Sequence, residues 1–341
     1  MPPNLSRKLK TLALICLFTS FCGVIYQLIN EERLNLNSVV VGLPLGFAFG
    51  IFELFLFPRA ERWFRNWSFT GIVVFKALLY TVVITFVVII LMLIAGLSEG
   101  RQINELWTAL VLPGQLILIG FTLCIYALLV FLLQVNRLLG EGVLWKFVLG
   151  KYHQPREEAR IFMFLDMNSS TTIAERLGHV RFYALLNELF HEISKPVRQT
   201  KAEIYQYVGD EVVLTWEVKD GLENSNCLKT FFMFRDILIK KRDDYLKNFG
   251  VAPEFKAGLH FGKVIAAQIG DLKREIVYNG DVLNTTARIR SECNTFKKDC
   301  LVSGMLQSRL KENKEFSWER IDLVGLRGKE AEIEIYSVSS N

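Results

Sequence analysis

The chain has 341 residues, of which 51% are hydrophobic and 22% are charged, with a net charge of +5 and a mean hydropathy of +0.27. This average is too apolar for a soluble protein of this length and too charged for an all-membrane protein, so we expect two units of different character. The composition excludes a disordered chain, a secreted disulfide scaffold and a soluble cytosolic enzyme. The six cysteines form no C-x-x-C pair, and no basic stripe indicates a nucleic-acid partner.

Four apolar windows dominate the first part of the chain, at residues 11–29, 39–57, 71–97 and 107–133. Together they hold only two charged side chains, Glu53 and Lys76. Each window reaches the roughly 20 residues that a helix needs to cross about 30 Å of hydrocarbon. We therefore expect residues 1–133 to form an N-terminal four-helix transmembrane bundle that anchors the protein.

The basic residues of the connections favour one orientation of this anchor. Three Lys or Arg residues lie before the first window, three lie between the second and third, and three follow the fourth up to Lys151, whereas the other two connections hold only Arg33 and Arg101. Because cytoplasmic loops carry the excess of Lys and Arg, both termini are expected in the cytoplasm. The sequence thus predicts a multi-pass protein of the cell inner (plasma) membrane with a cytoplasmic C-terminal unit.

The two charges inside the windows have two interpretations. Glu53 lies four residues from the end of its window and Lys76 five from the start of its own. We expect both side chains to reach the nearby membrane surface, rather than to form an intramembrane ion pair or a transport path. A transporter is not favoured, because few polar residues lie at mid-depth.

Residues 134–159 are expected to form a linker helix and a flexible step, since an amphipathic stretch there is interrupted by Gly140, Gly142, Gly150 and Pro155. This linker either transmits a change between the membrane and the cytoplasm or acts as a passive tether.

Residues 160–341 have the pattern of one α/β (α+β) domain. A β-α-β-β-α-β order is predicted from strand 160–166, helix 171–197, strands 202–208 and 211–216, helix 225–249 and strand 255–261. This order is typical of the ferredoxin-like split βαβ fold. A strand near 274–278, a helix at 282–294 and two strands at 318–324 and 332–338 follow.

The order of these elements brings two carboxylates together. Asp166 closes the first strand and Asp210 opens the third, and these two strands are expected to be adjacent and antiparallel. Carboxylate oxygens in this arrangement suit Mg²⁺ or Mn²⁺ together with substrate phosphates. The alternative is that Asp166 caps the following helix and Asp210 occupies a hairpin turn.

Three blocks together carry a family resemblance: FLDMNSST (164–171), YQYVGDEVVLTW (205–216) and VYNGDVLNTTARIR (277–290). In this order and at these separations they resemble the catalytic domain of class III nucleotidyl cyclases, and the resemblance covers residues 160–341. The four-span anchor is similar to that of membrane-bound bacterial adenylate cyclases. The resemblance implies a homodimer with active sites at the subunit interface, two metal ions, and conversion of ATP to 3′,5′-cyclic AMP with release of pyrophosphate.

The resemblance also implies roles for single residues. Asp166 and Asp210 match the two metal-binding aspartates. Asn284 and Arg288 match the pair that the partner subunit contributes, the Asn to orient the ribose and the Arg to stabilise charge at the α-phosphate. Thr171 is retained in the phosphate-binding turn, and the triphosphate-binding Lys of the family falls near Arg327, with Lys329 as the alternative.

Some positions depart from the family pattern. Ser169 and Ser170 replace the Gly-Phe of the phosphate-binding turn. The two base-reading positions hold Gln206 and Val277, and a Gln amide carries both a donor and an acceptor, so it suits adenine or guanine. We expect an adenylate cyclase; a guanylate cyclase and a non-catalytic nucleotide-binding membrane signalling module are the alternatives.

Overall fold

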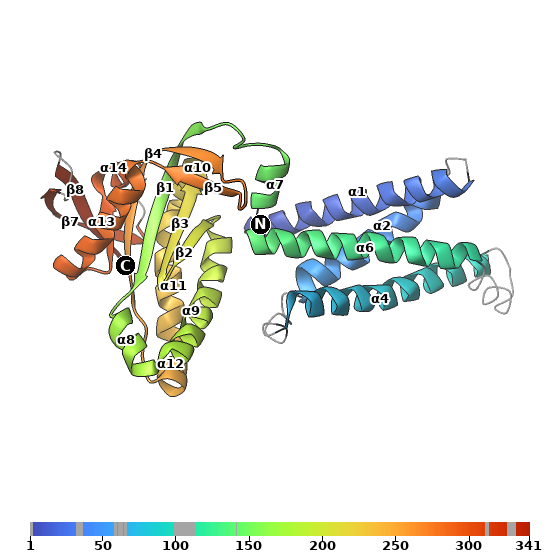
Figure 1. Ribbon diagram of the computed structural model, residues 1–341, viewed down its shortest axis with the longest axis horizontal. Helices are drawn as coiled ribbons and strands as arrows, with labels where there is room; N and C mark the ends of the chain where they lie inside the picture. Colours follow the sequence, from blue (N-terminus) through green and yellow to red (C-terminus); the bar gives the residue numbers. More distant parts are fainter. Residues whose placement is uncertain are drawn as a thin grey trace. The chain divides into compact units, whose positions relative to one another are not determined.

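The protein is described by a computed structural model that covers residues 3–31, 37–57, 60, 64, 67–98, 113–140, 142–310, 314–325 and 332–341. The chain divides into two compact units, Met1–Leu139 and Gly140–Asn341 (Figure 1). The first strand of the second unit begins at Arg156, four residues before the expected start of the α/β domain.

The described helices of unit 1 overlap the four apolar windows. They are α1 (Pro3–Glu31), α2 (Asn37–Ile51) with the π-helical turn η1 (Phe52–Leu56), α4 (Phe69–Ser98) and α6 (Pro113–Leu139). Two described stretches are long and apolar enough to cross a membrane, Lys8–Ile25 and Phe69–Val87, and shorter apolar stretches lie at Gly42–Leu56 and Leu123–Leu139. The four-span anchor therefore stays a prediction.

Helices α1 and α2 approach closely because α2 presents glycines at intervals of four residues. A Cβ atom added at Gly42 would lie 2.7 Å from the Cα of Ser20, and one at Gly46 would lie 2.8 Å from the Cα of Cys16. Small residues at this spacing allow helix backbones to come into contact. The interior of the unit is aromatic and aliphatic, with buried Ile15, Leu45, Phe49, Tyr80, Ile84, Tyr126 and Val130.

The expectation that Glu53 and Lys76 reach the membrane surface is wrong. Lys76 is 0% exposed and Glu53 is 2% exposed. The ammonium of Lys76 donates to both carboxylate oxygens of Glu53, at 2.6 and 2.8 Å, and the hydroxyl of Tyr80 donates to the same carboxylate. The two charges lie on faces of α4 and η1 that point into the bundle, so they pair with each other instead of reaching the aqueous boundary. The half-exposed guanidinium of Arg137 also lies 3.7 Å from the Glu53 carboxylate.

Unit 2 contains one sheet with the strand order β2-β3-β1-β4-β6-β8-β7, and β5 pairs with β4 outside this path. The strands are β1 (Arg156–Met167), β2 (Glu203–Val208), β3 (Glu211–Glu217), β4 (Phe255–Ile269), β5 (Glu275–Asn279), β6 (Cys300–Ser303), β7 (Phe316–Gly325) and β8 (Glu332–Ser340). Strand β1 pairs antiparallel with β3 on one side and with β4 along all twelve of its residues on the other. The β-α-β-β-α-β order and the adjacency of the first and third strands are confirmed.

Helices pack on both faces of this sheet (Figure 1). They are α8 (Ser170–Leu177), α9 (His179–Gln199), α10 (Val218–Leu222), η2 (Glu223–Ser225), α11 (Asn226–Lys240), α12 (Arg242–Phe249), α13 (Asp281–Thr295) and α14 (Gly304–Gln307), with α7 (Val143–Val148) ahead of β1. Because side chains alternate along a strand, Met163 packs with α9 and α11 whereas Phe162 packs with Val282 of α13. Helix α13 is thus on the opposite face from α9 and α11.

Several details differ from the expected elements. The helix expected at 225–249 is two helices, α11 and α12, and the strand expected at 255–261 continues to Ile269 as β4. The helix expected at 171–197 is two helices, because Gly178 has a φ of 74° and interrupts the hydrogen-bonding pattern. Strand β6 was not expected, since four residues are too few for a period-two pattern to be recognised, yet it pairs parallel with β4.

Candidate active site

The centre of the site is the end of β1. Asp166 is the penultimate residue of this strand and its register partner on β4 is Lys256. The preceding pair, Leu165 with Val212, fixes the end of β1 beside the start of β3. The apolar side chains of β1 alternate between the two faces of the sheet, and both faces are buried. The polar Asp166 therefore lies near the end of the strand, where it is only partly buried.

Asp210 is held in the turn between β2 and β3. Val208 pairs with Glu211, so Gly209 and Asp210 form a two-residue hairpin loop. Gly209 has a φ of 63°, a conformation that glycine adopts without strain at such loops. The Oδ2 atom of Asp210 is buried and has no hydrogen-bond partner among the described residues.

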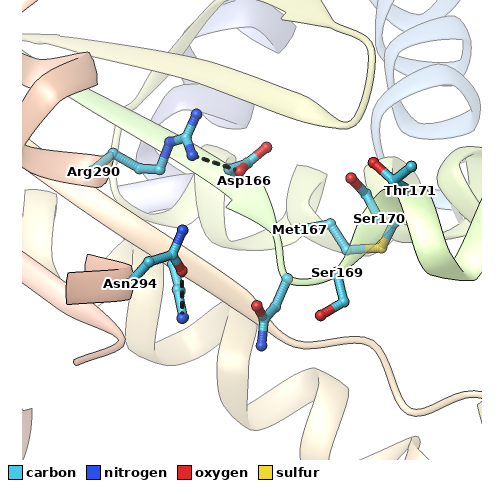
Figure 2. Close-up of a pocket in the computed structure, with 9 residues that line it drawn as sticks. Asp166, Met167, Ser169, Ser170, Thr171, Arg290 and Asn294 are labelled. Atoms are coloured by element: carbon cyan, nitrogen blue, oxygen red, sulfur yellow. Dashed lines mark hydrogen bonds and ion pairs between the residues drawn. The ribbon is translucent and has the colours of Figure 1, made fainter. Parts of the chain in front are cut away.

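A guanidinium from α13 faces both acidic strand ends. The Nη1 atom of Arg290 lies 2.9 Å from Oδ2 of Asp166, and its Nη2 atom lies 3.4 Å from Oε2 of Glu211. Figure 2 shows Arg290 pointing from α13 toward Asp166. Asp166, Asp210 and Glu211 together carry three formal negative charges against one positive charge on Arg290, so the cluster retains an excess of negative charge.

These charges change the pKa of the carboxyl groups. Burial raises the pKa of Asp166 to about 6; the Arg290 guanidinium opposes this increase, and the charge of Asp210 adds to it. Burial also raises the pKa of Glu211, and Arg290 again opposes the increase. The two aspartates are therefore close enough to interact electrostatically, as the order of elements predicts.

A pocket of about 190 Å³ adjoins Asp166. One side is the turn from Asp166 to Thr171, and Arg290 and Asn294 lie on the other side (Figure 2). Lys256 also lines the pocket. The Nζ atom of Lys256 donates to Oδ1 of Asn294 at 2.7 Å. Since Ser169 takes the left-handed conformation with a φ of 57°, the turn keeps a glycine-like backbone without glycine.

The pocket has the chemistry of an anion site. Helix α8 begins at Ser170, and the first N–H groups of a helix have no acceptor within it. These donors and the cationic side chains of Lys256 and Arg290 favour phosphate oxygens.

Asp166 and Asp210 suit a divalent cation whose remaining ligands are water and substrate phosphates. In the described parts of the chain, no three His, Cys, Asp or Glu side chains converge as a ready-made metal site. Mg²⁺ and Mn²⁺ commonly take one or two carboxylates and complete their coordination with water and substrate phosphates. Asp166 lines the phosphate-compatible pocket, and Asp210, which interacts with Asp166, has a buried oxygen without a partner among the described residues, so the two match that requirement.

Asn284 and Arg288 are not part of this pocket. Asn284 is exposed and Arg288 is half-buried, and neither makes a hydrogen bond or ion pair with another described side chain. At 100° per residue, their shared face of α13 is rotated by roughly 120° from the face that carries Arg290 and Asn294. Helix α13 therefore presents one polar face to Asp166 of its own chain and a second face away from it.

The two predicted base-reading residues come from β2 and β5. Gln206 is exposed and Val277 is half-buried. Their chain neighbours Tyr205 and Tyr278 contact each other, with ring centroids 5.1 Å apart and the Tyr278 N–H donating to the Tyr205 hydroxyl at 3.4 Å. Both predicted residues therefore belong to the same region of unit 2.

The remaining predictions have different outcomes. Thr171 is the second residue of α8 and lines the pocket. Arg327 and Lys329 lie outside the described residues. The sequence reasoning missed Glu211, Lys256, Arg290 and Asn294; only the register of β1 with β4 could have placed Lys256 opposite Asp166.

The second unit is similar to known proteins. A family model for the adenylate and guanylate cyclase catalytic domain matches residues 152–340. Adenylate cyclase 2 of Rhizobium meliloti (strain 1021) is 34% identical over 215 residues, which cover 63% of this chain. The chain spans 59% of the length of this curated relative.

Solved structures share the fold. Two structures of a bacterial light-regulated adenylyl cyclase match with TM-scores of 0.57 and 0.53 at 17% and 19% sequence identity. The first match covers 67% of each chain and the second covers 63% of each chain.

Proposed function

Because the chain belongs to the family of adenylate and guanylate cyclase catalytic domains, we propose that it converts ATP to 3′,5′-cyclic AMP and pyrophosphate. The observation that carries this proposal is that Asp166, which interacts with Asp210, lines a pocket together with Lys256, Arg290 and the start of α8. Carboxylates next to an anion site are what a metal-nucleotide complex requires. The similarity to an adenylate cyclase at 34% identity favours ATP as the nucleotide.

Asp166 and Asp210 would hold two Mg²⁺ or Mn²⁺ ions. When bound, such ions lower the pKa of the ribose 3′-hydroxyl and neutralise charge on the triphosphate. In the reaction, the 3′-oxygen forms a bond to the α-phosphorus and loses its proton. The bond between that phosphorus and the bridging oxygen to the β-phosphate breaks, and pyrophosphate leaves with both electrons of that bond.

The protein's own side chains bind and orient the nucleotide. Lys256 and the N–H groups of the first turn of α8 would bind the phosphate tail, and Thr171 lies in that turn. Arg327 or Lys329 would add a further cation to the triphosphate. Gln206 and Val277 would face the base, and the Gln206 amide would present its donor and acceptor to the adenine edge.

Asn284 and Arg288 would act on the nucleotide bound to the other subunit of a homodimer. Their face of α13 is turned away from Asp166 of the same chain, which supports a role across a two-fold interface. Asn284 would orient the ribose. Arg288 would stabilise the charge that develops at the α-phosphate, and the loss of one such donor typically lowers kcat by about 10²- to 10³-fold.

The anchor proposal rests on how unit 1 distributes its side chains. Large apolar residues are exposed along its helices, among them Leu14, Leu17, Phe21, Leu78, Val82, Phe86 and Ile117. The charged pair Glu53 and Lys76 is buried instead. Apolar exteriors around polar interiors suit a lipid environment, so we assign residues 1–133 to a four-helix transmembrane anchor in the inner (plasma) membrane, with residues 134–159 as the linker and 160–341 as the cytoplasmic catalytic domain.

Complementation tests the shared site. Asp166→Ala and Arg288→Ala variants, each inactive alone, are co-expressed so that mixed dimers form. Each mixed dimer has one intact site, so random pairing at equal expression should restore about a quarter of wild-type cyclic AMP production.

The matched control is co-expression of Asp166→Ala with Asp210→Ala. Both aspartates of a site come from one chain, so these mixed dimers have no intact site and should stay inactive. Equal activity in the two co-expressions, or none in either beside an active wild type, would contradict the shared site.

A guanylate cyclase is the second candidate, because the Gln206 amide can pair with guanine as well as with adenine. Supplying ATP and GTP in competition and measuring both cyclic products decides between them. The third candidate, a non-catalytic nucleotide-binding module, is motivated by the replacement of the Gly-Phe turn with Ser169 and Ser170. Nucleotide binding without turnover at saturating Mn²⁺ would establish that candidate.

A further inference from the structure

The guanidinium of Arg290 lies against Asp166, where a metal cation is expected to bind. Its guanidinium bridges two carboxylates on different strands, Asp166 at the end of β1 and Glu211 at the start of β3. All three side chains are less than a quarter exposed, so water screens their charges only partly. A bridging guanidinium of this kind holds two carboxylates that would otherwise repel each other.

The backbone at Arg290 is fixed against the sheet. A Cβ atom added at Gly258 of β4 would lie 2.3 Å from the Arg290 backbone nitrogen, which shows how closely α13 approaches this strand. Gly258 pairs with Phe164 of β1, two residues before Asp166. The root of the Arg290 side chain therefore has a defined position relative to Asp166, and only the guanidinium end can move.

The guanidinium is incompletely satisfied in this position. Its Nε atom is buried and has no hydrogen-bond partner within the described part of the chain. Arg290 also lines the pocket beside Ser170 and Lys256, so the guanidinium has space next to it. An incompletely bonded cation beside an open space is easier to displace than one with all its donors paired.

We propose that Arg290 is a positioning residue that holds Asp166 and Glu211 in the metal-free chain and must leave Asp166 when a divalent cation binds, so that it sets the metal affinity of the site. This inference rests on the proposed function, since it takes Asp166 as a metal ligand. A divalent ion and the guanidinium compete for the same oxygen, Oδ2 of Asp166. Removing the competitor should therefore strengthen metal binding, whereas removing a merely structural contact would weaken it.

The experiment measures Mn²⁺ binding to the full chain in detergent without nucleotide, by the electron paramagnetic resonance signal of free Mn²⁺. The pH is about 8, where carboxyl groups are ionised. Asp166→Ala defines which part of the binding belongs to this site. Arg290→Gln should bind Mn²⁺ about 10- to 100-fold more tightly than wild type, the range expected when a charge-assisted hydrogen bond no longer competes.

Two further variants separate displacement from a general charge effect. Arg320→Gln removes an exposed guanidinium that is paired with Glu334 at 2.7 Å, and it should leave the Mn²⁺ affinity unchanged. Arg290→Lys keeps the charge but cannot bridge two carboxylates, so it should bind Mn²⁺ more tightly than wild type and less tightly than Arg290→Gln. If Arg290→Gln fails to fold, the comparison of Arg290→Lys with wild type decides the question.

The outcomes distinguish this inference from the proposed function. If Asp166→Ala abolishes Mn²⁺ binding but Arg290→Gln binds no more tightly than wild type, the competition by Arg290 is overturned and the metal site stands. If Arg290→Lys binds Mn²⁺ with wild-type affinity, displacement is likewise overturned. If Asp166→Ala binds Mn²⁺ as wild type does, both the metal site and the role of Arg290 are overturned.

Discussion

The close approach of β4 and α13 at Gly258 predicts a large effect for a single methyl group. In Gly258→Ala the new Cβ would lie 2.3 Å from the nitrogen and 2.6 Å from the Cα of Arg290. Ordinary contacts begin near 3.4 Å, so α13 must move away from the sheet by about 1 Å, because backbone atoms cannot turn aside. Overpacking of this kind costs about 1–3 kcal/mol of unfolding free energy, which lowers the melting temperature of a domain of this size by about 2–12 °C.

The displacement should also reduce activity, since α13 carries Arg290, Asn284 and Arg288. A misplacement of about 1 Å can lower the rate by about 10²-fold. Thermal unfolding and cyclic AMP production of purified Gly258→Ala would be compared with those of wild type.

Gly262→Ala is the matched control in the same strand. Its Cβ would meet the Cγ2 atom of Val282 at 2.5 Å, and its next contacts are at 3.7 Å. A side chain can adjust where a backbone cannot, so this variant should lose less stability and less activity. The reasoning would be refuted if Gly258→Ala melted within about 1 °C of wild type, or if Gly262→Ala were the more damaging change.

Two other predictions concern buried charge. Lys76→Met removes the ammonium from the buried Glu53 carboxylate and leaves Arg137, 3.7 Å away, as its cationic partner. This variant should destabilise unit 1 by up to about 3–5 kcal/mol, and the double variant Lys76→Met/Glu53→Gln should recover most of this loss. Thermal unfolding of the full chain in detergent measures both, and a double variant as unstable as the single one would contradict the ion-pair argument. The pKa of Asp166 is raised to about 6, and only the ionised carboxylate binds a metal ion. The Mn²⁺ affinity should therefore fall by about tenfold for each pH unit below about 6; an affinity that stays constant between about pH 7 and pH 5 would exclude Asp166 as a ligand.

The sequence predicts the proximity of Asp166 and Asp210 because that proximity depends only on the order of the elements. Antiparallel neighbours place the end of β1 next to the start of β3 whatever the details of packing. The hairpin at Gly209 and Asp210 can likewise be predicted from the local sequence, because a two-residue loop with glycine between two strands is typical of a hairpin. Predictions of this kind need no knowledge of how helices rest on the sheet.

The contacts of Arg290 could not be predicted, because they depend on the rotation and distance of α13 over the sheet. That placement is set by the absence of a side chain at Gly258, more than thirty residues earlier in the chain. The burial of Lys76 and Glu53 was misjudged for a related reason. Their positions along the apolar windows indicate depth in a membrane, but only the neighbouring helices determine which face is enclosed.

The unbroken pairing of β1 with β4 has a mechanical consequence. From Arg156 with Ala266 to Met167 with Phe255, every residue of β1 has a partner, over a length of about 36 Å. A strand paired in this way cannot slip by one residue without turning its apolar side chains to the opposite face. The paired strands β1 and β4 are therefore stiff. A change in the tilt of β1 at the end that follows the linker should also move the Asp166 carboxylate at the other end of the strand.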